Sequence, residues 1–387
     1  MSDQLRVGML TSVGSNCGIA AYTASLIDGL SKIADVTIEP ILEGQQPIEH
    51  YQQQASRLNE CDVIHIQHEH SFWGGIMPRK SMFWHMRYLL KKPVVITAHT
   101  TTALRDLLKT DAEKRLPQKL VKLALLSWKS YRDGVETAPF ITGRTIVHTA
   151  AARQDLINRG AKGEYIHVIS AGVPRAIVSP TGGTEFRAQH SLESKSIVSL
   201  FGFIAPNKGY EIALEALEDL DDNVVLVIAG GARTSDMEPY LETLRGEIAK
   251  TRLAGRVIIT RYLDDNALAE VMAASDLAIT PHTYATGSYS VMVPLAYGKA
   301  IIASDMDCFV EIAEDGGALK IVNAGSSAEL TDAINALLSD DVSRHKLESA
   351  ATEYSNRRSW DAVALQTLQV YKEAILDETR LAHHGHH

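Results

Sequence analysis

Lys208 stands where an apolar strand gives way to a helix, a position from which a lysine can bind phosphate. Residues 200–210 read Leu-Phe-Gly-Phe-Ile-Ala-Pro-Asn-Lys-Gly-Tyr, which predicts a strand, a glycine-containing turn and the start of an amphipathic helix. Ligands of α/β proteins bind outside the carboxyl ends of strands, and an ammonium group there can place a compact charge on a diphosphate. The same pattern fits a solvated lysine beside an ordinary turn, because this motif alone is not specific.

A second candidate anion site follows the apolar strand that ends near Pro281. A Thr-Gly-Ser turn at 286–288 precedes a helix predicted over 290–297. The first amides of a helix lack partners and attract anions, Gly287 lets the backbone approach a ligand, and Ser288 or Ser290 can donate a hydroxyl. Ser288 could instead be an ordinary helix N-cap. Two such sites at strand ends of one domain favour phosphate binding over the ordinary alternatives.

Histidines mark the ends of two further strands. His65, His68, Glu69 and His70 close one apolar run, and His99 follows another at 94–97. On a strand His68 and His70 share a face while His65 points the other way, so the group is a poor ligand set and we expect no metal. We expect His68, Glu69 and His70 to line the acceptor or sugar side of a cleft, although a satisfied structural role fits the same pattern. His99 could bind sugar hydroxyls or be a satisfied core histidine.

Strands and helices alternate around these residues almost from end to end. The strands are near-continuous in Val, Ile and Leu, which indicates burial on both faces of a parallel sheet, and the alternation indicates a doubly wound α/β fold. The alternation pauses in a stretch rich in Gly, Pro and Ser. We therefore predict two doubly wound, Rossmann-like domains, at 1–172 and 196–358, with a linker at 173–195 and a purification tag at 381–387.

Composition limits the classes of function. The chain has 387 residues, enough for two domains, and its three separated cysteines suggest neither disulfides nor a zinc site. We expect a cytoplasmic protein without a signal peptide or a membrane span. The net charge of −9 argues against nucleic-acid binding.

One region departs from this acidic balance. Between Trp73 and Asp133 there are 13 Lys or Arg and 4 Asp or Glu, and 13 − 4 gives a local charge of +9. A helix predicted over 114–132 carries leucines and lysines together. The basic region 79–132 could contact an anionic membrane from the cytoplasmic side, although a solvated helix packed on a sheet has the same pattern.

With both anion sites in view, the chain resembles the retaining GT-B glycosyltransferases of family 4 over nearly its whole length. The resembling segments are 16–22, 62–68, 95–99, 168–173, 201–209, 226–231, 273–281 and 298–304 followed by Glu311. The resemblance implies two domains facing a central cleft, with acceptor binding in the first and nucleotide-sugar binding in the second. It also implies that a last helix, at 359–380, returns to complete the first domain.

The resemblance assigns roles to single residues. Lys208 matches the lysine on the donor diphosphate, Gly18 a glycine whose amide faces the phosphates, and His99 a catalytic-site histidine near the transferred sugar. Glu311 matches an acidic donor-site residue. The donor site then includes Tyr289 and Ser290 beside the Gly287–Ser288 turn, and Tyr262, whose ring could stack on the nucleobase or be an ordinary exposed side chain.

Two departures from the family pattern affect this site. Phe203 stands where an arginine is common, and Ala285 and Val293 stand where two glutamates are common. The second glutamate usually holds the nucleotide ribose, so its loss bears on the identity of the nucleotide. The Gly287–Ser288 turn fits branches of the family that use such a turn in its place.

These features predict a glycosyltransferase that moves a hexose with retention from a nucleotide-diphosphate sugar, UDP before GDP. The acceptor would be a saccharide or a lipid-linked sugar in polysaccharide or envelope synthesis, and no metal or other cofactor is expected. The alternatives are a non-catalytic homologue that binds nucleotide or sugar and, less well matched, a nucleotide-sugar 2-epimerase. A Rossmann dehydrogenase is disfavoured, because Gly14 and Gly18 lack the GxGxxG spacing.

Overall fold

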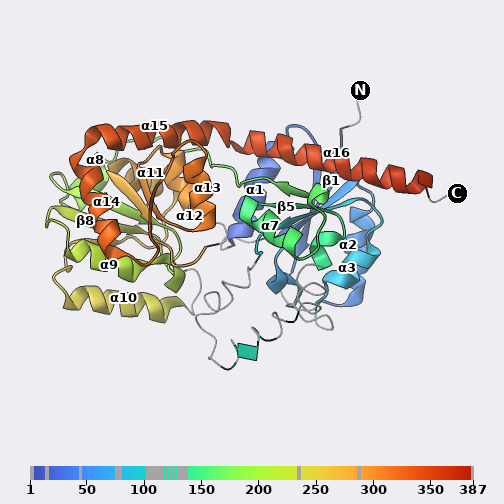
Figure 1. Cartoon of the computed structure of the whole chain (residues 1–387), viewed down its shortest axis with the longest axis horizontal. Coiled ribbons are helices and arrows are strands. Elements are labelled where there is room, and N and C mark those ends of the chain that lie inside the picture. The colour runs from blue at the N-terminus through green and yellow to red at the C-terminus, as the bar shows by residue number, and fades with distance from the viewer. Residues whose placement is uncertain are drawn as a thin grey trace. The chain divides into compact units, whose positions relative to one another are not determined.

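The computed structural model describes residues 4–13, 17–42, 46–74, 81–101, 138–232, 237–285 and 289–384, with single residues between 117 and 128. The chain divides into two compact units (Figure 1). Unit 1 combines Met1–Gly172 with Trp360–His387, and unit 2 is Val173–Ser359. Each unit is built on one parallel sheet, which confirms the predicted α/β class with two parallel sheets.

The sheet of unit 1 has the order β2-β1-β3-β4-β5-β6, with every neighbouring pair parallel. Its strands are β1 (Arg6–Ser12), β2 (Asp35–Ile41), β3 (Val63–His68), β4 (Val94–Ala98), β5 (Arg144–Val147) and β6 (Ile166–Val168). The order reverses between β1 and β3. In a doubly wound sheet such a reversal leaves a crevice at the carboxyl ends of the two strands.

Helices cover both faces of this sheet. The helices α2 (Ile48–Leu58), α3 (Phe83–Leu89) and α7 (Ala150–Asn158) pack their apolar residues on one face. On the other face, α1 (Gly18–Leu30) packs against α16 (Trp360–His384), the last helix of the chain. Gly29 makes this contact close, because a Cβ there would lie 2.7 Å from the carbonyl oxygen of Trp360. Helix α16 continues to His384, so the first residues of the segment predicted as a tag at 381–387 belong to this helix.

The sheet of unit 2 has the order β9-β8-β7-β10-β11-β12 and is also parallel. Its strands are β7 (Ser196–Phe201), β8 (Val224–Ala229), β9 (Val257–Ile259), β10 (Leu277–Thr280), β11 (Ile301–Ser304) and β12 (Lys320–Val322). In chain order this is 3-2-1-4-5-6, and the reversal lies between β7 and β10. Their carboxyl ends are where a ligand of this fold is expected.

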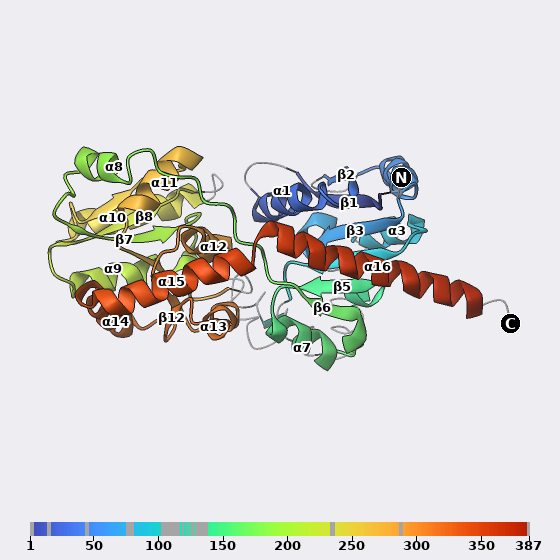
Figure 2. The same cartoon turned by 90° about the horizontal axis from the view of Figure 1, so that it is seen from above.

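Two helical layers enclose this sheet (Figure 2). On one face lie α9 (Tyr210–Glu218), α10 (Glu238–Lys250) and α14 (Ser327–Ser339), and on the other α8 (Thr184–Gln189), α11 (Asp265–Ala274) and α12 (Tyr289–Ala296). The helices α13 (Asp307–Glu314) and α15 (Asp341–Arg357) complete the unit. Helix α8 differs from the predicted linker at 173–195: Phe186 and Leu192 are buried in the core of unit 2, which the glycines and prolines around them obscured.

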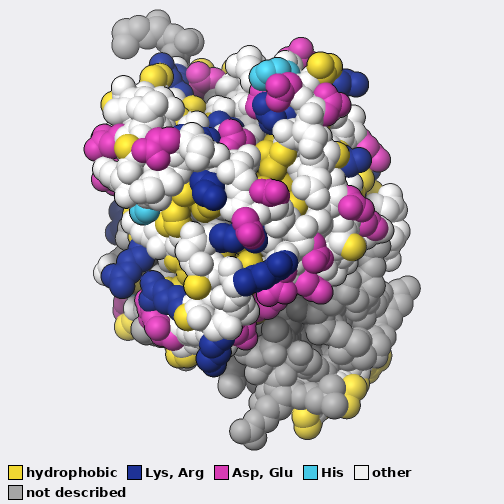
Figure 3. Space-filling view, turned by 90° about the vertical axis from the view of Figure 1, so that its left-hand side faces the viewer, with side chains coloured by type: hydrophobic (Ala, Val, Ile, Leu, Met, Phe, Trp, Pro, Cys, Tyr) yellow, Lys and Arg dark blue, Asp and Glu magenta, His cyan; other side chains and the backbone are white. Residues whose placement is uncertain are grey.

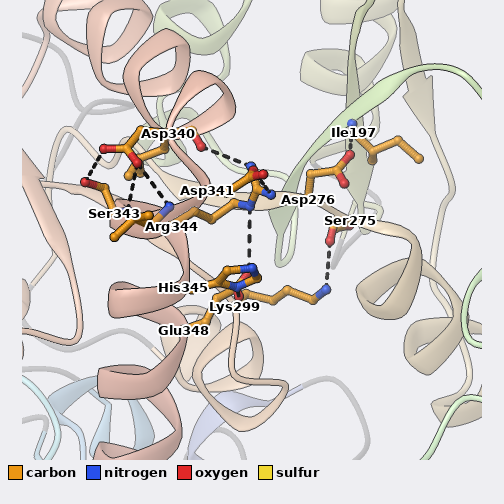
Figure 4. Close-up of polar contacts among 12 residues, drawn as sticks. Ile197, Ser275, Asp276, Lys299, Asp340, Asp341, Ser343, Arg344, His345 and Glu348 are labelled. Atoms are coloured by element: carbon orange, nitrogen blue, oxygen red, sulfur yellow. Dashed lines mark hydrogen bonds and ion pairs between the residues drawn. The ribbon is translucent and has the colours of Figure 1, made fainter.

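Charged residues tie the amino ends of the unit 2 strands together (Figure 4). The Asp276 carboxylate accepts from the amide of Ile197 at 2.7 Å, and the Lys299 ammonium donates to the carbonyl of Ser275 at 2.7 Å. Nearby, Asp340 caps α15 by accepting from the amides of Val342 and Ser343. These contacts lie at the edge opposite to Lys208 and hold the ends of elements in place.

The predicted element positions agree with the structure to within a few residues at most ends. The strand predicted over 94–97 is β4, and the helix predicted over 290–297 is α12, which begins and ends one residue earlier. The helix predicted over 114–132 lies outside the described residues, apart from single positions.

Candidate functional site

Lys208 and His282 lie together at the reversal point of the unit 2 sheet. Lys208 ends a short 3-10 turn (Pro206–Lys208) after β7, and His282 follows β10, the neighbouring strand. The Lys208 ammonium nitrogen is 2.9 Å from His282 Nε2 and 3.4 Å from Ser290 Oγ at the start of α12. Ser290 Oγ is in turn 3.3 Å from His282 Nε2. We call Lys208, His282 and Ser290 the lysine triad.

The chemistry of the lysine triad fixes its protonation. A lysine ammonium only donates hydrogen bonds, so His282 Nε2 must accept and the imidazole proton sits on Nδ1. Burial and the charge of Lys208 hold the pKa of His282 well below its usual range, so the ring stays neutral. Burial also lowers the pKa of Lys208 to about 8. The triad thus presents a cation that titrates near neutral pH and is held by neutral partners.

Neighbouring groups hold His282 in place. Ser304 Oγ, at the end of β11, donates to the His282 carbonyl at 2.7 Å, and the Phe309 ring meets the imidazole edge-on at 5.3 Å between centroids. Cys308 lies on the same helix as Phe309, with Sγ 3.9 Å from the carbonyl oxygen of Ala285. Burial raises the pKa of the Cys308 thiol to about 12, so it stays protonated beside Lys208.

Glycines let the backbone close around the triad. Gly209 has φ +75°, and a Cβ there would lie 1.9 Å from the carbonyl oxygen of Pro281, so only glycine joins the Lys208 turn to the end of β10. Gly202, with φ +136°, passes Ser290 closely enough that a Cβ would lie 3.2 Å from the serine Cβ. The turn after β7 is therefore pressed against the two segments that follow β10.

Four other residues predicted for the donor site are described in unit 2. Tyr289 begins α12 beside Ser290, half-buried, and Phe203 lies in the turn before Lys208, where its carbonyl accepts from the Tyr210 hydroxyl at 3.4 Å. Glu311 is half-buried on α13, one turn from Cys308. Tyr262 is 72% exposed after β9. Gly287 and Ser288 lie outside the described residues.

In unit 1 the predicted residues also gather at carboxyl strand ends. Gly18 is the first residue of α1, exposed, and the preceding Cys17 forms no side-chain cap. Glu69 accepts from the amide of His70 at 3.0 Å and from the Thr100 hydroxyl, and burial raises the pKa of its carboxyl.

His68 has different surroundings from its neighbours. Its ring is buried edge-on against Phe83 and Phe140, with centroids 5.1 Å away in both cases. Glu69 and His70 are half-buried and form the more open part of this group. Within the described ranges, no three His, Cys, Asp or Glu side chains converge as possible ligands of a metal ion.

His99 belongs to a buried network of polar side chains. Its Nε2 is 2.7 Å from Gln67 Oε1, and its Nδ1 is 3.4 Å from Nε2 of His148, which follows β5. Gln67 reaches His65, whose Nδ1 lies 2.6 Å from the hydroxyl of Tyr371 on α16. The Tyr22 ring packs edge-on against His99 at 5.0 Å. His99 thus lies at the strand end where it was predicted, with both ring nitrogens in contact with protein groups.

The sequence pattern did not single out His282, His148 or Gln67. His282 comes two residues after the apolar strand β10, much as His99 follows β4, and this signal could have found it. His148 had the same signal, because it directly follows the apolar residues at the end of β5. Gln67 lies inside a strand, and nothing in its local sequence distinguishes it from a buried polar residue without a function.

Two family models match successive parts of the chain. The model described as Glycosyltransferase Family 4 matches residues 43–176, and the one described as Glycosyl transferases group 1 matches residues 183–354. The first match lies in unit 1 apart from its last four residues, and the second lies in unit 2.

Similar proteins are found by sequence and by structure. A phosphatidyl-myo-inositol mannosyltransferase of Mycobacterium leprae is 27% identical over 319 residues, covering 81% of this chain and 74% of that protein. A D-inositol 3-phosphate glycosyltransferase of Corynebacterium glutamicum is 25% identical, covering 82% and 75%. The crystal structure of Anabaena HepE in complex with UDP and glucose matches with a TM-score of 0.73 at 17% identity, covering 95% of this chain and 99% of that one.

Proposed function

Because this chain belongs to the family 4 glycosyltransferases and has their GT-B fold, and so transfers a sugar from a nucleotide sugar, we propose that its donor is a UDP-linked hexose. A GDP-linked hexose is the second choice. We further propose that the sugar keeps its anomeric configuration and that the acceptor is a saccharide or a lipid-linked polyol or sugar. The lysine triad is the observation that carries the proposal.

The triad suits the charge that this reaction develops. Breaking the bond between sugar and diphosphate builds negative charge on the leaving group, and a fixed donor aimed at that charge lowers the barrier. Lys208 supplies the cation, Ser290 a hydroxyl and the start of α12 its backbone amides. Because His282 is neutral, it holds Lys208 without cancelling its charge.

Unit 1 supplies residues suited to the sugar and the acceptor. His99, Glu69 and His70 can form hydrogen bonds with hydroxyl groups, and the exposed first amides of α1 at Gly18 can face a phosphate. With a donor phosphate oxygen accepting the proton of the acceptor hydroxyl, a retaining transfer needs no carboxylate pair of the glycosidase kind. The names of the two curated relatives make inositol and its phosphates the first acceptors to test.

A peripheral contact with anionic lipid is also proposed for unit 1. The large side chains that are strongly exposed there include Tyr88 at 84%, Trp128 at 65% and Ile141 at 58%. The basic region 79–132 surrounds Tyr88 and Trp128 in the sequence, mostly outside the described residues.

By contrast, the face of unit 2 in Figure 3 intersperses acidic and basic side chains. None of the described helices is both long and apolar enough to span a bilayer. Sedimentation with phosphatidylglycerol vesicles, and not with phosphatidylcholine vesicles, would support this contact.

The donor proposal is tested by a thermal-shift screen with UDP, GDP and ADP and their common sugars. A ligand that binds only the folded protein raises its melting temperature by mass action. We expect UDP and a UDP-hexose to stabilise the wild type and a Lys299→Met variant, and not a Lys208→Met variant. Lys299 is the matched control, since it is a half-buried lysine at the opposite edge of the same sheet.

The outcomes separate the parts of the proposal. Stabilisation by GDP alone would mean that the donor carries GDP instead of UDP, with the lysine triad still the proposed phosphate site. Equal stabilisation of both lysine variants would show that Lys208 is not part of that site. Stabilisation by none of the nucleotides would contradict the proposed donor. Retention is tested separately, by reading the anomeric configuration of the product from its proton couplings in NMR.

A further inference from the structure

A continuous series of buried and half-buried polar contacts crosses unit 1 from α16 to the end of β5. Tyr371, His65 and Gln67 are fully buried. The successive contacts are Tyr371 Oη to His65 Nδ1 at 2.6 Å, His65 to Gln67 at 3.3 Å, Gln67 to His99 Nε2 at 2.7 Å, His99 Nδ1 to His148 Nε2 at 3.4 Å and His148 Nδ1 to the Ile169 carbonyl oxygen at 3.0 Å. We call this series the histidine network.

The direction of its hydrogen bonds is set from the Ile169 end. A carbonyl oxygen only accepts, so His148 must donate to Ile169 from Nδ1. A neutral His148 then has its lone pair on Nε2, and His99 must donate to it from Nδ1. A neutral His99 in turn has its lone pair on Nε2, which faces Gln67.

Gln67 can satisfy this lone pair. A half-turn of its amide exchanges the oxygen and the nitrogen, so that the nitrogen donates to His99 and the oxygen accepts from His65. His65 Nε2 also lies 2.7 Å from the Thr97 hydroxyl, which can share the same proton. His65 Nδ1 then accepts from Tyr371, and every group in the network is neutral.

The opposite amide orientation costs an extra charge. With the Gln67 oxygen facing His99, His99 must donate from Nε2 to that oxygen, and His148 must still donate from Nδ1 to the Ile169 carbonyl. Two neutral rings would then bring two lone pairs together at 3.4 Å, so the contact would need an additional proton. Burial lowers the pKa of both histidines and disfavours that charge. The neutral network therefore has one consistent direction.

We propose that His148 is a positioning residue, which fixes His99 as the tautomer with its proton on Nδ1 and its lone pair on Nε2. This inference rests on the proposed place of His99 beside the transferred sugar. His99 then meets a sugar hydroxyl as a hydrogen-bond acceptor, and a hydroxyl that displaces or shares the Gln67 contact donates to Nε2. His148 itself need not touch the sugar.

The test is the tautomer of His99, read from long-range proton–nitrogen correlations of protein labelled with 15N-histidine. The His99 signals are assigned from the spectrum of His99→Gln. In wild type at pH 7.5 we expect the proton on Nδ1. In His148→Leu, which removes the acceptor for that proton, we expect it on Nε2, with the Gln67 amide turned to accept it. We expect kcat to fall about tenfold, the size that loss of one buried hydrogen bond allows, with a smaller change in the donor KM.

A second variant covers the case in which His148→Leu does not fold. An ionised glutamate in Gln67→Glu offers His99 only acceptor oxygens, so His99 donates from Nε2 and the histidine pair gains a proton, visible as an imidazolium signal at pH 7.5. Tyr354→Phe, a buried tyrosine substitution in unit 2, is the control and should leave the His99 signals in place. A wild-type His99 with its proton on Nε2, or a tautomer unchanged in both variants, would overturn the inference. The tautomer of His99 is read without a bound donor, so this inference can fail while the proposed donor specificity stands, and the reverse.

Discussion

Lys208 and Lys299 are half-buried lysines at opposite edges of the sheet in unit 2, and their surroundings differ. Lys299, before β11 at the amino edge, donates to the carbonyl of Ser275, and the carboxylates of Glu348 and Asp276 partly restore the pKa that burial lowers. Lys208, at the carboxyl edge, has His282 and Ser290 as partners, and burial lowers its pKa to about 8. Nearby carboxylates stabilise the charge of Lys299, while Lys208 is hydrogen-bonded only to neutral side chains among its named partners.

This contrast separates two uses of a buried charge. A cation near carboxylates and hydrogen-bonded to backbone is stabilised by the folded protein alone, so it contributes to the fold. A cation held by an imidazole and a hydroxyl keeps most of its field for an incoming anion, and its desolvation is offset only when that anion binds. The predictions that follow test this difference, from the largest expected effect at Lys208 to the smallest, with Lys299 as the counterpart.

The largest effect is expected for replacement of Lys208 by methionine, which keeps the length of the side chain and removes its charge. Loss of one fixed charge from the leaving-group site lowers kcat by about 10² to 10³. The melting temperature should not fall, because the variant removes a desolvated cation. The measurement is the initial rate with a saturating nucleotide sugar.

Lys299→Met is the counterpart. It loses a hydrogen bond worth about 1 kcal/mol, so we expect a melting temperature about 2–4 °C lower and little change in kcat. If both variants lost activity alike, the contrast between the two edges would fail. A Lys208→Met variant that retained more than about a tenth of the wild-type rate would remove Lys208 from the leaving-group site.

Donor binding should depend on pH through Lys208. The lysine carries its charge below its pKa of about 8 and loses it above, and a bound diphosphate raises that pKa by stabilising the charged form. The Kd for nucleotide should therefore be flat below pH 8 and weaken by up to about tenfold per pH unit above it. Calorimetric titrations from pH 6.5 to 9.5 measure this, with Lys208→Arg as the variant that should stay flat, since arginine keeps its charge. A flat wild-type profile would contradict the assignment.

The smallest effect at the Lys208 site concerns His282. His282→Leu removes the acceptor that orients the Lys208 ammonium group, and we expect kcat/KM to fall about tenfold. His282→Gln places an amide oxygen near the position of Nε2 and should recover most of this loss. Equal losses in both variants would indicate that the imidazole ring acts through its packing on Phe309, and not through its nitrogen.

The sequence allowed the strand ends to be predicted and left the contacts between them open. Apolar runs bounded by glycine and polar residues mark where β7 and β4 end, which is why Lys208 and His99 could be proposed. The contact of Lys208 with His282 spans 74 positions and exists because β7 and β10 are neighbours, which only the strand order decides. His65 and Tyr371 are 306 positions apart and meet because α16 packs on unit 1. Local periodicity carries no information about either pairing.

The discontinuity of unit 1 has a consequence for synthesis on the ribosome. Unit 2 is one uninterrupted segment and has all its elements once residue 359 has emerged. Unit 1 begins first and is completed last, because α1 packs against α16 and His65 pairs with Tyr371. While nearly 190 further residues are made, about 10–40 seconds at ordinary elongation rates, the part of the unit 1 sheet face over β3 and β4 that α16 later covers stays uncovered. This interval is when the chain is most open to chaperones and to aggregation, and docking of the last helix ends it.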